Sequence, residues 1–358
     1  MMTRWIRCAS LAASMLLAAV AVASSKDVRL SGAGATFPAP LYTLWVSEFQ
    51  KLHPTIKIDY RSIGSGGGVK AITDRTVAFG ASDAPLNARE IEALGGPDAI
   101  VHIPTVAGGV VPAYNLPGVT AELKFTGEII ADIYLGKISS WDDPRLREIN
   151  PGVTLPRLAI TPVFRTDGSG TTFVFTSYLA TQSPIFAGEI GAGKQVNWPL
   201  GQGGKGNEGV AAAIQQTRGA LGYVEQNYAA ANKIAYGAVR NSKGNFIRAT
   251  PATMSAAGEG HSDALKGTVF QANIWNAAGP DAYPISAFTY LIFFRNLDNL
   301  VDAADAEAFV KFVRWAVSDG QKFAADLEYA PLSPEVRAQV ESVLDRVTHK
   351  GQPLSTAK

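Results

Sequence analysis

The chain has 358 residues, of which 47% are hydrophobic and 18% are charged, with 32 basic and 31 acidic side chains. Its near-neutral charge and its lack of a basic run argue against nucleic acid or a membrane surface as a partner, because both need clustered Lys and Arg. A chain of this length exceeds what one hydrophobic core usually organises, so two domains are expected.

Residues 1–23 have the layout of a cleavable secretory signal peptide. Arg4 and Arg7 precede an apolar run over residues 9–22, which is too short to span a bilayer as a mature helix. A small-residue Ala-x-Ala site ends the run, so the mature chain is expected to begin near Ser24. Loss of the two arginines would leave 30 basic against 31 acidic side chains, a net charge of about −1.

The only cysteine, Cys8, lies before this apolar run and not at its end. It cannot become the acylated first residue of a lipoprotein, so we expect an exported periplasmic protein that is not a lipoprotein. A mature chain without cysteine excludes disulfide scaffolds and thiol chemistry. We expect no metal and no cofactor, because the four histidines stand apart from acidic motifs and no carboxylates cluster.

Strands and helices alternate along the first part of the mature chain. Apolar patterns predict strands near residues 28–31, 56–60 and 77–82, and helices over residues 41–52 and 69–72. This order predicts an α/β fold with largely parallel strands.

A second region of alternation follows. The predicted elements are a strand over residues 158–164, helices over 171–179 and 210–214, a strand over 220–224, a strand over 288–294 and an amphipathic helix over 309–315. The pattern indicates a second α/β lobe, although periodicity alone does not assign the last strand and helix to either lobe.

Four stretches share one design, a glycine- or hydroxyl-rich turn at the start of a predicted helix. They cover residues 32–38, 64–68, 167–172 and 203–209. A helix start exposes unpaired N–H groups and a partial positive charge, and glycine lets a ligand approach the backbone. Any one stretch could simply cap its helix or turn the chain, but four that converge would form a cage for an oxyanion.

Known nucleotide and catalytic motifs do not match these stretches. Phe37 stands where a dinucleotide-binding motif needs its third glycine, and Lys205 is followed by glycine where a phosphate-binding P-loop needs Ser or Thr. Neither Ser65 nor Ser169 lies in a G-x-S-x-G sequence. The stretches therefore favour binding over catalysis.

Charged residues accompany the candidate cage. Arg165 and Asp167 are two positions apart at the end of a predicted strand, so the carboxylate can brace the guanidinium toward a ligand. The alternative is a turn-forming Asp-Gly beside a surface arginine. Asp83 ends another predicted strand, and it could also merely begin the next helix.

Longer segments overlap the four turns, and others lie between and after them along the chain. They are Gly32–Tyr42 (GAGATFPAPLY), Ile63–Ile72 (IGSGGGVKAI), Phe79–Leu86 (FGASDAPL), Asp132–Lys137 (DIYLGK), Asp167–Leu179 (DGSGTTFVFTSYL), Gly203–Asn207 (GGKGN) and Gly219–Glu225 (GALGYVE). In these segments the chain resembles the phosphate-binding proteins of bacterial phosphate ABC transporters, the PstS family. The resemblance implies a type II periplasmic binding protein fold of two α/β lobes joined by a hinge. Lobe I would contain residues 26–105 and 284–358, and lobe II residues 106–283.

The resemblance also implies the site and its ligand. Phosphate contacts would come from Thr36, the Phe37 N–H, Ser65, Asp83, Arg165, Ser169, Gly170 and Thr171, with Asp167 bracing the arginine. The chain would be a monomeric, non-catalytic receptor that delivers inorganic phosphate to the inner-membrane permease subunits of an ABC transporter. Asp83 would accept a hydrogen bond from protonated phosphate, whereas fully deprotonated sulfate would leave two acceptors facing each other.

Other functions remain open from the residues alone. Sulfate, molybdate or arsenate could occupy a cage of this kind. A secreted phosphohydrolase would need a base beside Ser169 or a set of metal ligands. A structural or adhesive secreted protein is the third alternative.

Overall fold

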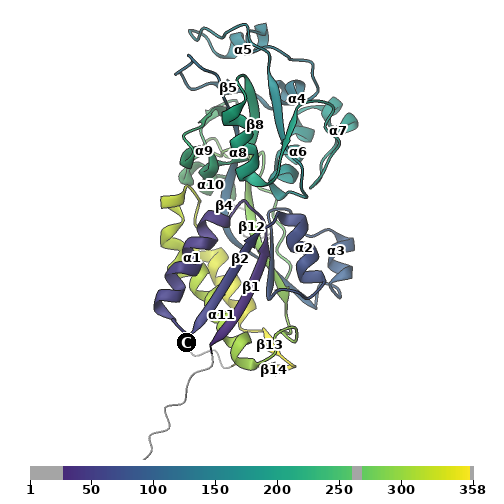
Figure 1. The fold of residues 1–358 in the computed structure, drawn as a ribbon, viewed down its shortest axis with the longest axis vertical. Coiled ribbons are helices and arrows are strands. Elements are labelled where there is room, and N and C mark those ends of the chain that lie inside the picture. Colours follow the sequence, from purple (N-terminus) through teal and green to yellow (C-terminus); the bar gives the residue numbers. More distant parts are fainter. Residues whose placement is uncertain (1–26, 260–267, 355–358) are drawn as a thin grey trace, which may run out of the picture.

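The computed structural model describes residues 27–259 and 268–354, and its α/β elements form two lobes stacked along the long axis of the molecule (Figure 1). The predicted signal peptide and Cys8 lie outside the described residues. Among the helices of the described ranges, none is long and apolar enough to cross a membrane.

The sheet of the first lobe has the strand order β2-β1-β3-β12-β4. Its strands are β1 (Val28–Gly34), β2 (Ile56–Ser62), β3 (Phe79–Ser82), β4 (Ile100–Tyr114) and β12 (Ser286–Phe294). β1 pairs in parallel with β2 and β3, whereas β12 is antiparallel to both β3 and β4. The three strands predicted in the first part of the chain are β1, β2 and β3.

Helices cover both faces of this first sheet. They are α1 (Ala39–Leu52), α2 (Ser65–Thr73), α3 (Ala88–Ala93), α11 (Ala303–Val317) and α12 (Pro334–Leu344). α1 and α11 share one core with the sheet, where Phe79 of β3 stacks on Phe309 of α11 at 5.6 Å between ring centroids. α2 lies on the other face, where Val69 and Ile72 pack beside Ala33.

β4 passes from one lobe to the other as a single strand. Its residues up to Gly109 pair with β12, and its residues from Val110 pair with β8 (Ala220–Glu225). The second sheet continues from β8 to β6 (Thr161–Arg165) and then β7 (Gln202–Gly204), with parallel pairing from β8 outward. The chain has returned to the first sheet by residues 268–270, before it enters β12.

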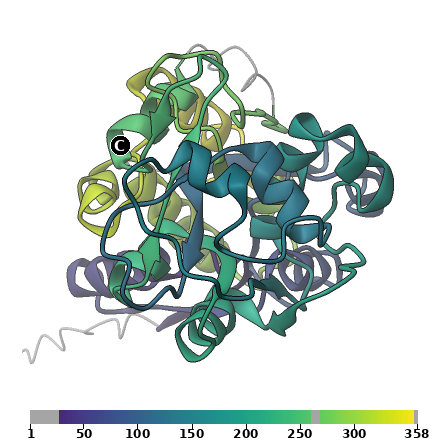
Figure 2. The same cartoon turned by 90° about the horizontal axis from the view of Figure 1, so that it is seen from above.

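Helices surround the second sheet, and Figure 2 shows this lobe from above, in teal and green, in front of the first lobe. They are α4 (Gly127–Tyr134), α5 (Pro144–Ile149), α6 (Gly170–Gln182), α7 (Pro184–Glu189), α8 (Gly206–Gln216) and α9 (Gln226–Ala231). A further helix, α10 (Pro251–Gly258), packs on β4 and β12 instead. The core of the second lobe is aromatic: Phe175 of α6 stacks on Tyr223 of β8 at 4.2 Å between ring centroids.

Short elements complete the described chain. They are β5 (Lys124–Phe125), β9 (Ala235–Tyr236), β10 (Ala238–Arg240), β11 (Phe246–Ile247), the 3-10 turns η2 (Asp319–Phe323) and η3 (Ala325–Leu327), β13 (Thr348–His349) and β14 (Gln352–Pro353). Residues 268–270, which the sequence places in lobe II, hydrogen-bond to His102 of β4, beside the first sheet. The residue boundaries of the two lobes remain a prediction.

Candidate functional site

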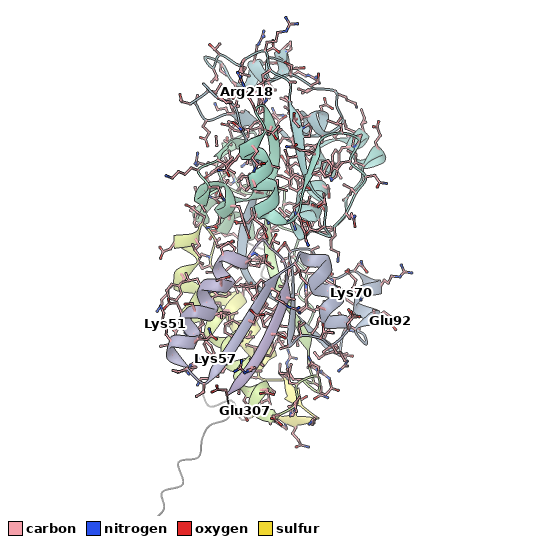
Figure 3. The ribbon with its side chains drawn as sticks, viewed as in Figure 1. Lys51, Lys57, Lys70, Glu92, Arg218 and Glu307 are labelled. Atoms are coloured by element: carbon pink, nitrogen blue, oxygen red, sulfur yellow. The ribbon has the colours of Figure 1, made fainter. Side chains whose placement is uncertain are left out.

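The four glycine- and hydroxyl-rich turns meet at the junction of the two lobes. The first joins β1 to α1, the second begins α2, the third joins β6 to α6 and the fourth joins β7 to α8. Hydrogen bonds across the junction link the first turn to the fourth and the second to the third. Charged side chains labelled in Figure 3, such as Lys57, Lys70 and Arg218, lie on the outer surfaces of the lobes, away from this junction.

Ser65, the first residue of α2, connects the two lobes through its hydroxyl. Its Oγ accepts a hydrogen bond from the Gly170 N–H at 3.0 Å and another from the Asp83 N–H at 3.3 Å. The same hydroxyl lies 3.4 Å from the Asp83 carboxylate and can donate to it. The second and third helix starts are therefore joined directly, side chain to backbone.

Asn207 makes the matching connection between the first and fourth turns. Its Nδ2 donates to the hydroxyl of Thr36 at 2.8 Å and to that of Thr171 at 3.1 Å. Its Oδ1 accepts from the Glu225 N–H at 3.0 Å, which fixes the orientation of the amide. Asn207 was not among the predicted site residues, although its segment had been singled out as a helix start of the right kind.

Arg165 is held at the junction by Asp167 in a two-pronged ion pair. Nε and Nη2 donate to the two carboxylate oxygens at 2.8 and 2.6 Å, and Nη1 points to the Thr171 hydroxyl at 3.3 Å. The Gly206 N–H donates to the same carboxylate at 3.0 Å. Only 1% of the Arg165 side chain is exposed, so a positively charged guanidinium group in a fixed orientation is buried between the lobes.

The carboxyl groups of Asp167 and Asp83 have pKa values that are shifted in opposite directions. Burial opposes ionisation of Asp167, but the hydrogen bonds and charge of Arg165, with the Gly206 N–H, hold the pKa of Asp167 below its ordinary value. Asp83 is 1% exposed and accepts from the Thr289 hydroxyl at 2.8 Å. Burial raises the pKa of Asp83 to about 7, although the Thr289 hydrogen bond and the charge of Arg165 oppose the rise.

Two glycines let the lobes approach this closely. A Cβ on Gly170 would lie 2.4 Å from the Asp83 Oδ2 and 2.5 Å from the Ser65 Oγ. Gly64 has a φ of 86°, and a Cβ there would lie 2.3 Å from the Asp167 Oδ2. Neither position tolerates a side chain without displacement of the site.

The structure brings all nine predicted residues to the junction. They are Thr36, Phe37, Ser65, Asp83, Arg165, Asp167, Ser169, Gly170 and Thr171. The Phe37 ring packs in the core beside Tyr329, and its N–H donates to no other described residue. Ser169 caps α6 by accepting from the Thr172 N–H at 3.0 Å. The contact that each residue makes with a ligand remains a prediction.

Residues that the sequence did not predict complete the site. Thr289 lies on β12 and reaches Asp83 from a position 206 residues further along the chain, so no local pattern could reveal it. In the part of the chain that the structure describes, no group of three or more His, Cys, Asp or Glu side chains could hold a metal ion. The arrangement is that of a binding site built from N–H groups, hydroxyls and one guanidinium.

Known proteins resemble the chain in sequence over most of its length. A family model described as a PBP superfamily domain matches residues 21–319. The phosphate-binding protein PstS of Xylella fastidiosa (strain 9a5c) is 41% identical over 319 residues, which cover 89% of this chain and 85% of the relative. The phosphate-binding protein PstS of Haemophilus influenzae (strain ATCC 51907 / DSM 11121 / KW20 / Rd) is 39% identical, with 87% and 91% covered.

Solved structures share the fold. A high affinity periplasmic phosphate-binding protein bound with phosphate superimposes with a TM-score of 0.69 at 20% identity, covering 88% of this chain and 93% of that one. A phosphate-binding protein from Stenotrophomonas maltophilia gives 0.67 at 19% identity, with 88% and 93% covered. The predicted two-lobed, type II periplasmic binding protein fold is thereby confirmed. The chain belongs to the PstS family of phosphate-binding proteins, within the PBP superfamily.

Proposed function

We propose that the chain is an extracytoplasmic receptor that binds inorganic phosphate between its two lobes and hands it to an ABC permease, with no catalysis. The proposal rests above all on the junction itself, where four helix starts and the buried Arg165 surround Asp83. The names of the PstS relatives support it, as does the phosphate bound to a structural neighbour of the same fold.

The predicted contacts divide among three kinds of group. Backbone N–H groups of Phe37 and Gly170 would donate to phosphate oxygens at two helix starts. The hydroxyls of Thr36, Ser65, Ser169 and Thr171 would add further donors, and Arg165 would supply the full positive charge. Hydrogen bonds from a charged donor are roughly twice as strong as neutral ones, so Arg165 should contribute most.

Asp83 distinguishes phosphate from other tetrahedral anions in this proposal. Phosphate carries a proton at neutral pH and can donate it in a hydrogen bond to the carboxylate. Sulfate carries none, so its oxygen and the buried carboxylate would face each other as two unpaired acceptors. Molybdate is disfavoured on the same ground, whereas arsenate is protonated like phosphate and should bind as a mimic.

Calorimetric titration of the purified chain with phosphate and with sulfate at pH 8 tests the proposal. We expect tight binding of one phosphate per chain and sulfate binding that is weaker by about tenfold or more. Equal affinities, or the absence of phosphate binding, would overturn the proposal. A colorimetric assay with a phosphomonoester should show no hydrolysis; turnover would instead favour the phosphohydrolase alternative.

The partner and the location follow from the same proposal. We expect the chain to be a periplasmic monomer that docks on the inner-membrane permease subunits. Cells that lack the gene should lose high-affinity phosphate uptake and regain it when the full chain is supplied. Unimpaired uptake in the deletion strain would contradict this part.

A further inference from the structure

Tyrosine hydroxyls hold three consecutive carbonyl groups of the first turn. Tyr60 donates to the Ala35 carbonyl at 2.7 Å, Tyr228 to the Thr36 carbonyl at 2.6 Å, and Tyr329 to the Phe37 carbonyl at 2.6 Å. The three tyrosines come from β2, from α9 and from the segment that follows η3. The Thr36 carbonyl also accepts a hydrogen bond from the Ala39 N–H of its own lobe, at 3.2 Å.

Because the peptide unit is planar, each of these hydrogen bonds to a carbonyl also affects the N–H group of the same peptide unit. In a trans peptide the C=O and the next N–H point in opposite directions, so a donor on the carbonyl also fixes and polarises that N–H. The Thr36 carbonyl shares its peptide unit with the Phe37 N–H, a predicted phosphate donor. The Ala35 carbonyl shares its unit with the Thr36 N–H, and the Phe37 carbonyl precedes Pro38, which has no N–H.

Tyr228 differs from Tyr60 because it reaches the turn from the other lobe. It lies on α9, which follows β8 of the second sheet, 192 residues from Thr36. Asn207, also of the second lobe, bonds the hydroxyl of the same Thr36. The opposite lobe thus contacts Thr36 at both its carbonyl and its side chain, and the Tyr228 bond to the carbonyl is shorter than the 3.2 Å bond from Ala39. Burial raises the pKa of Tyr228, so its hydroxyl keeps the proton that it donates.

The neighbours of Tyr228 anchor α9 on the first lobe. Gln226 Nε2 donates to the Glu328 carboxylate at 3.0 Å, and Asn227 Nδ2 donates to the Leu327 carbonyl at 3.1 Å. Three consecutive side chains at the start of α9 therefore bond to the first lobe. This contact keeps the Tyr228 hydroxyl within reach of Thr36.

We propose that Tyr228 is a positioning residue of the phosphate site, which aims the Phe37 N–H of the first lobe at the anion when the second lobe closes on it. The inference rests on the proposed function. Closure would then do more than surround the anion, because it would complete the orientation of a donor on the opposite wall.

The test compares Tyr228→Phe with Tyr60→Phe, which remove matching hydroxyls from adjacent carbonyls. Phosphate dissociation is followed by stopped flow, and we expect Tyr228→Phe to raise the rate about threefold to tenfold, with little change in the association rate. Tyr60→Phe should alter dissociation less than twofold, because its bond lies within one lobe and does not require the second lobe. Thermal melts without phosphate establish that both variants are folded.

The amide resonance of Phe37 provides a second readout. Its phosphate-induced shift should be large in the unsubstituted chain and in Tyr60→Phe, and reduced in Tyr228→Phe. Equal dissociation rates for the two variants, or an unchanged Phe37 shift in Tyr228→Phe, would overturn the inference while leaving phosphate binding intact. Failure of the unsubstituted chain to bind phosphate would overturn the proposed function as well, so the two failures can be told apart.

Discussion

Substitution of Asp83 by asparagine should remove most of the preference for phosphate over sulfate. Asparagine has nearly the same shape, and its Oδ1 can keep the 2.8 Å hydrogen bond from Thr289. The other position changes from an acceptor to an amide that donates. A sulfate oxygen that faced an unpaired carboxylate would then face a donor.

The structure sets the size of this effect. In the unsubstituted chain sulfate must either face an ionised Asp83, which costs about 1–3 kcal/mol or more, or bind with Asp83 protonated. With a pKa of about 7, protonation of Asp83 at pH 8 lowers the affinity by a factor of about ten. Because the cheaper of these two routes sets the penalty, Asp83→Asn should strengthen sulfate binding at pH 8 by about tenfold, with a smaller effect on phosphate.

The pH dependence of sulfate binding provides an internal control. The carboxyl takes up its proton as the pH falls through about 7, so sulfate affinity of the unsubstituted chain should rise from pH 8 to pH 6. In Asp83→Asn it should be flat over the same range. Calorimetry at both pH values measures this, and an unchanged sulfate affinity in the variant, or a flat profile in the unsubstituted chain, would refute the reasoning.

Further substitutions test the roles of Asp167 and Gly170 and the effect of the buried Asp83 carboxyl on the stability of the fold. Asp167→Asn should weaken phosphate binding about tenfold, because Arg165 keeps its charge but loses a charged partner; a calorimetric affinity within twofold of the unsubstituted chain would contradict the bracing role. Gly170→Ala should weaken binding about 10- to 100-fold, since its Cβ would lie 2.4 Å from Asp83, whereas Gly188→Ala on α7, with no atom within 4 Å, should not; equal affinities would speak against the steric argument. In the absence of phosphate, Asp83→Asn should raise the free energy of unfolding at pH 8 by up to about 4 kcal/mol. The pKa of Asp83 is about 7 in the folded chain and 3.8 in the unfolded chain, so ionisation of this carboxyl opposes folding. Urea titrations should show that the gain in stability shrinks as the pH is lowered toward 4.

Local patterns were sufficient to predict strands in which buried and exposed side chains alternate. The strands predicted at residues 28–31 and 56–60 correspond to β1 and β2, because alternating side chains record which face is buried. The strand predicted at residues 77–82 corresponds to β3, which is buried throughout, although the predicted stretch alternates the larger Val77 and Phe79 with smaller residues. β4 was missed. All 15 of its residues are buried, so it carries no alternation, and Pro104, Gly108 and Gly109 interrupt it with residues that are typical of turns.

Some residues of the site could likewise be predicted from local sequence, and others could not. The helix starts could be read from the sequence because a turn and the helix after it are neighbours in the chain. Thr289 and Tyr228 could not, since each meets its partner across about two hundred residues and neither belongs to a motif. Asn207 lay in a recognised turn, but only its place between Thr36 and Thr171 gives it a role.

The sequence by itself determined the alternation of strands and helices, the four anion-binding turns and, through resemblance, the family. Only the tertiary structure decided that these turns meet, because β4 must pair with β12 over one half and with β8 over the other to bring the lobes together. It also decided the state of Asp83. A carboxyl that would have a pKa of 3.8 in water has one of about 7 here because folding removes it from solvent, and burial of this kind is a property of the packed chain and not of any segment within it.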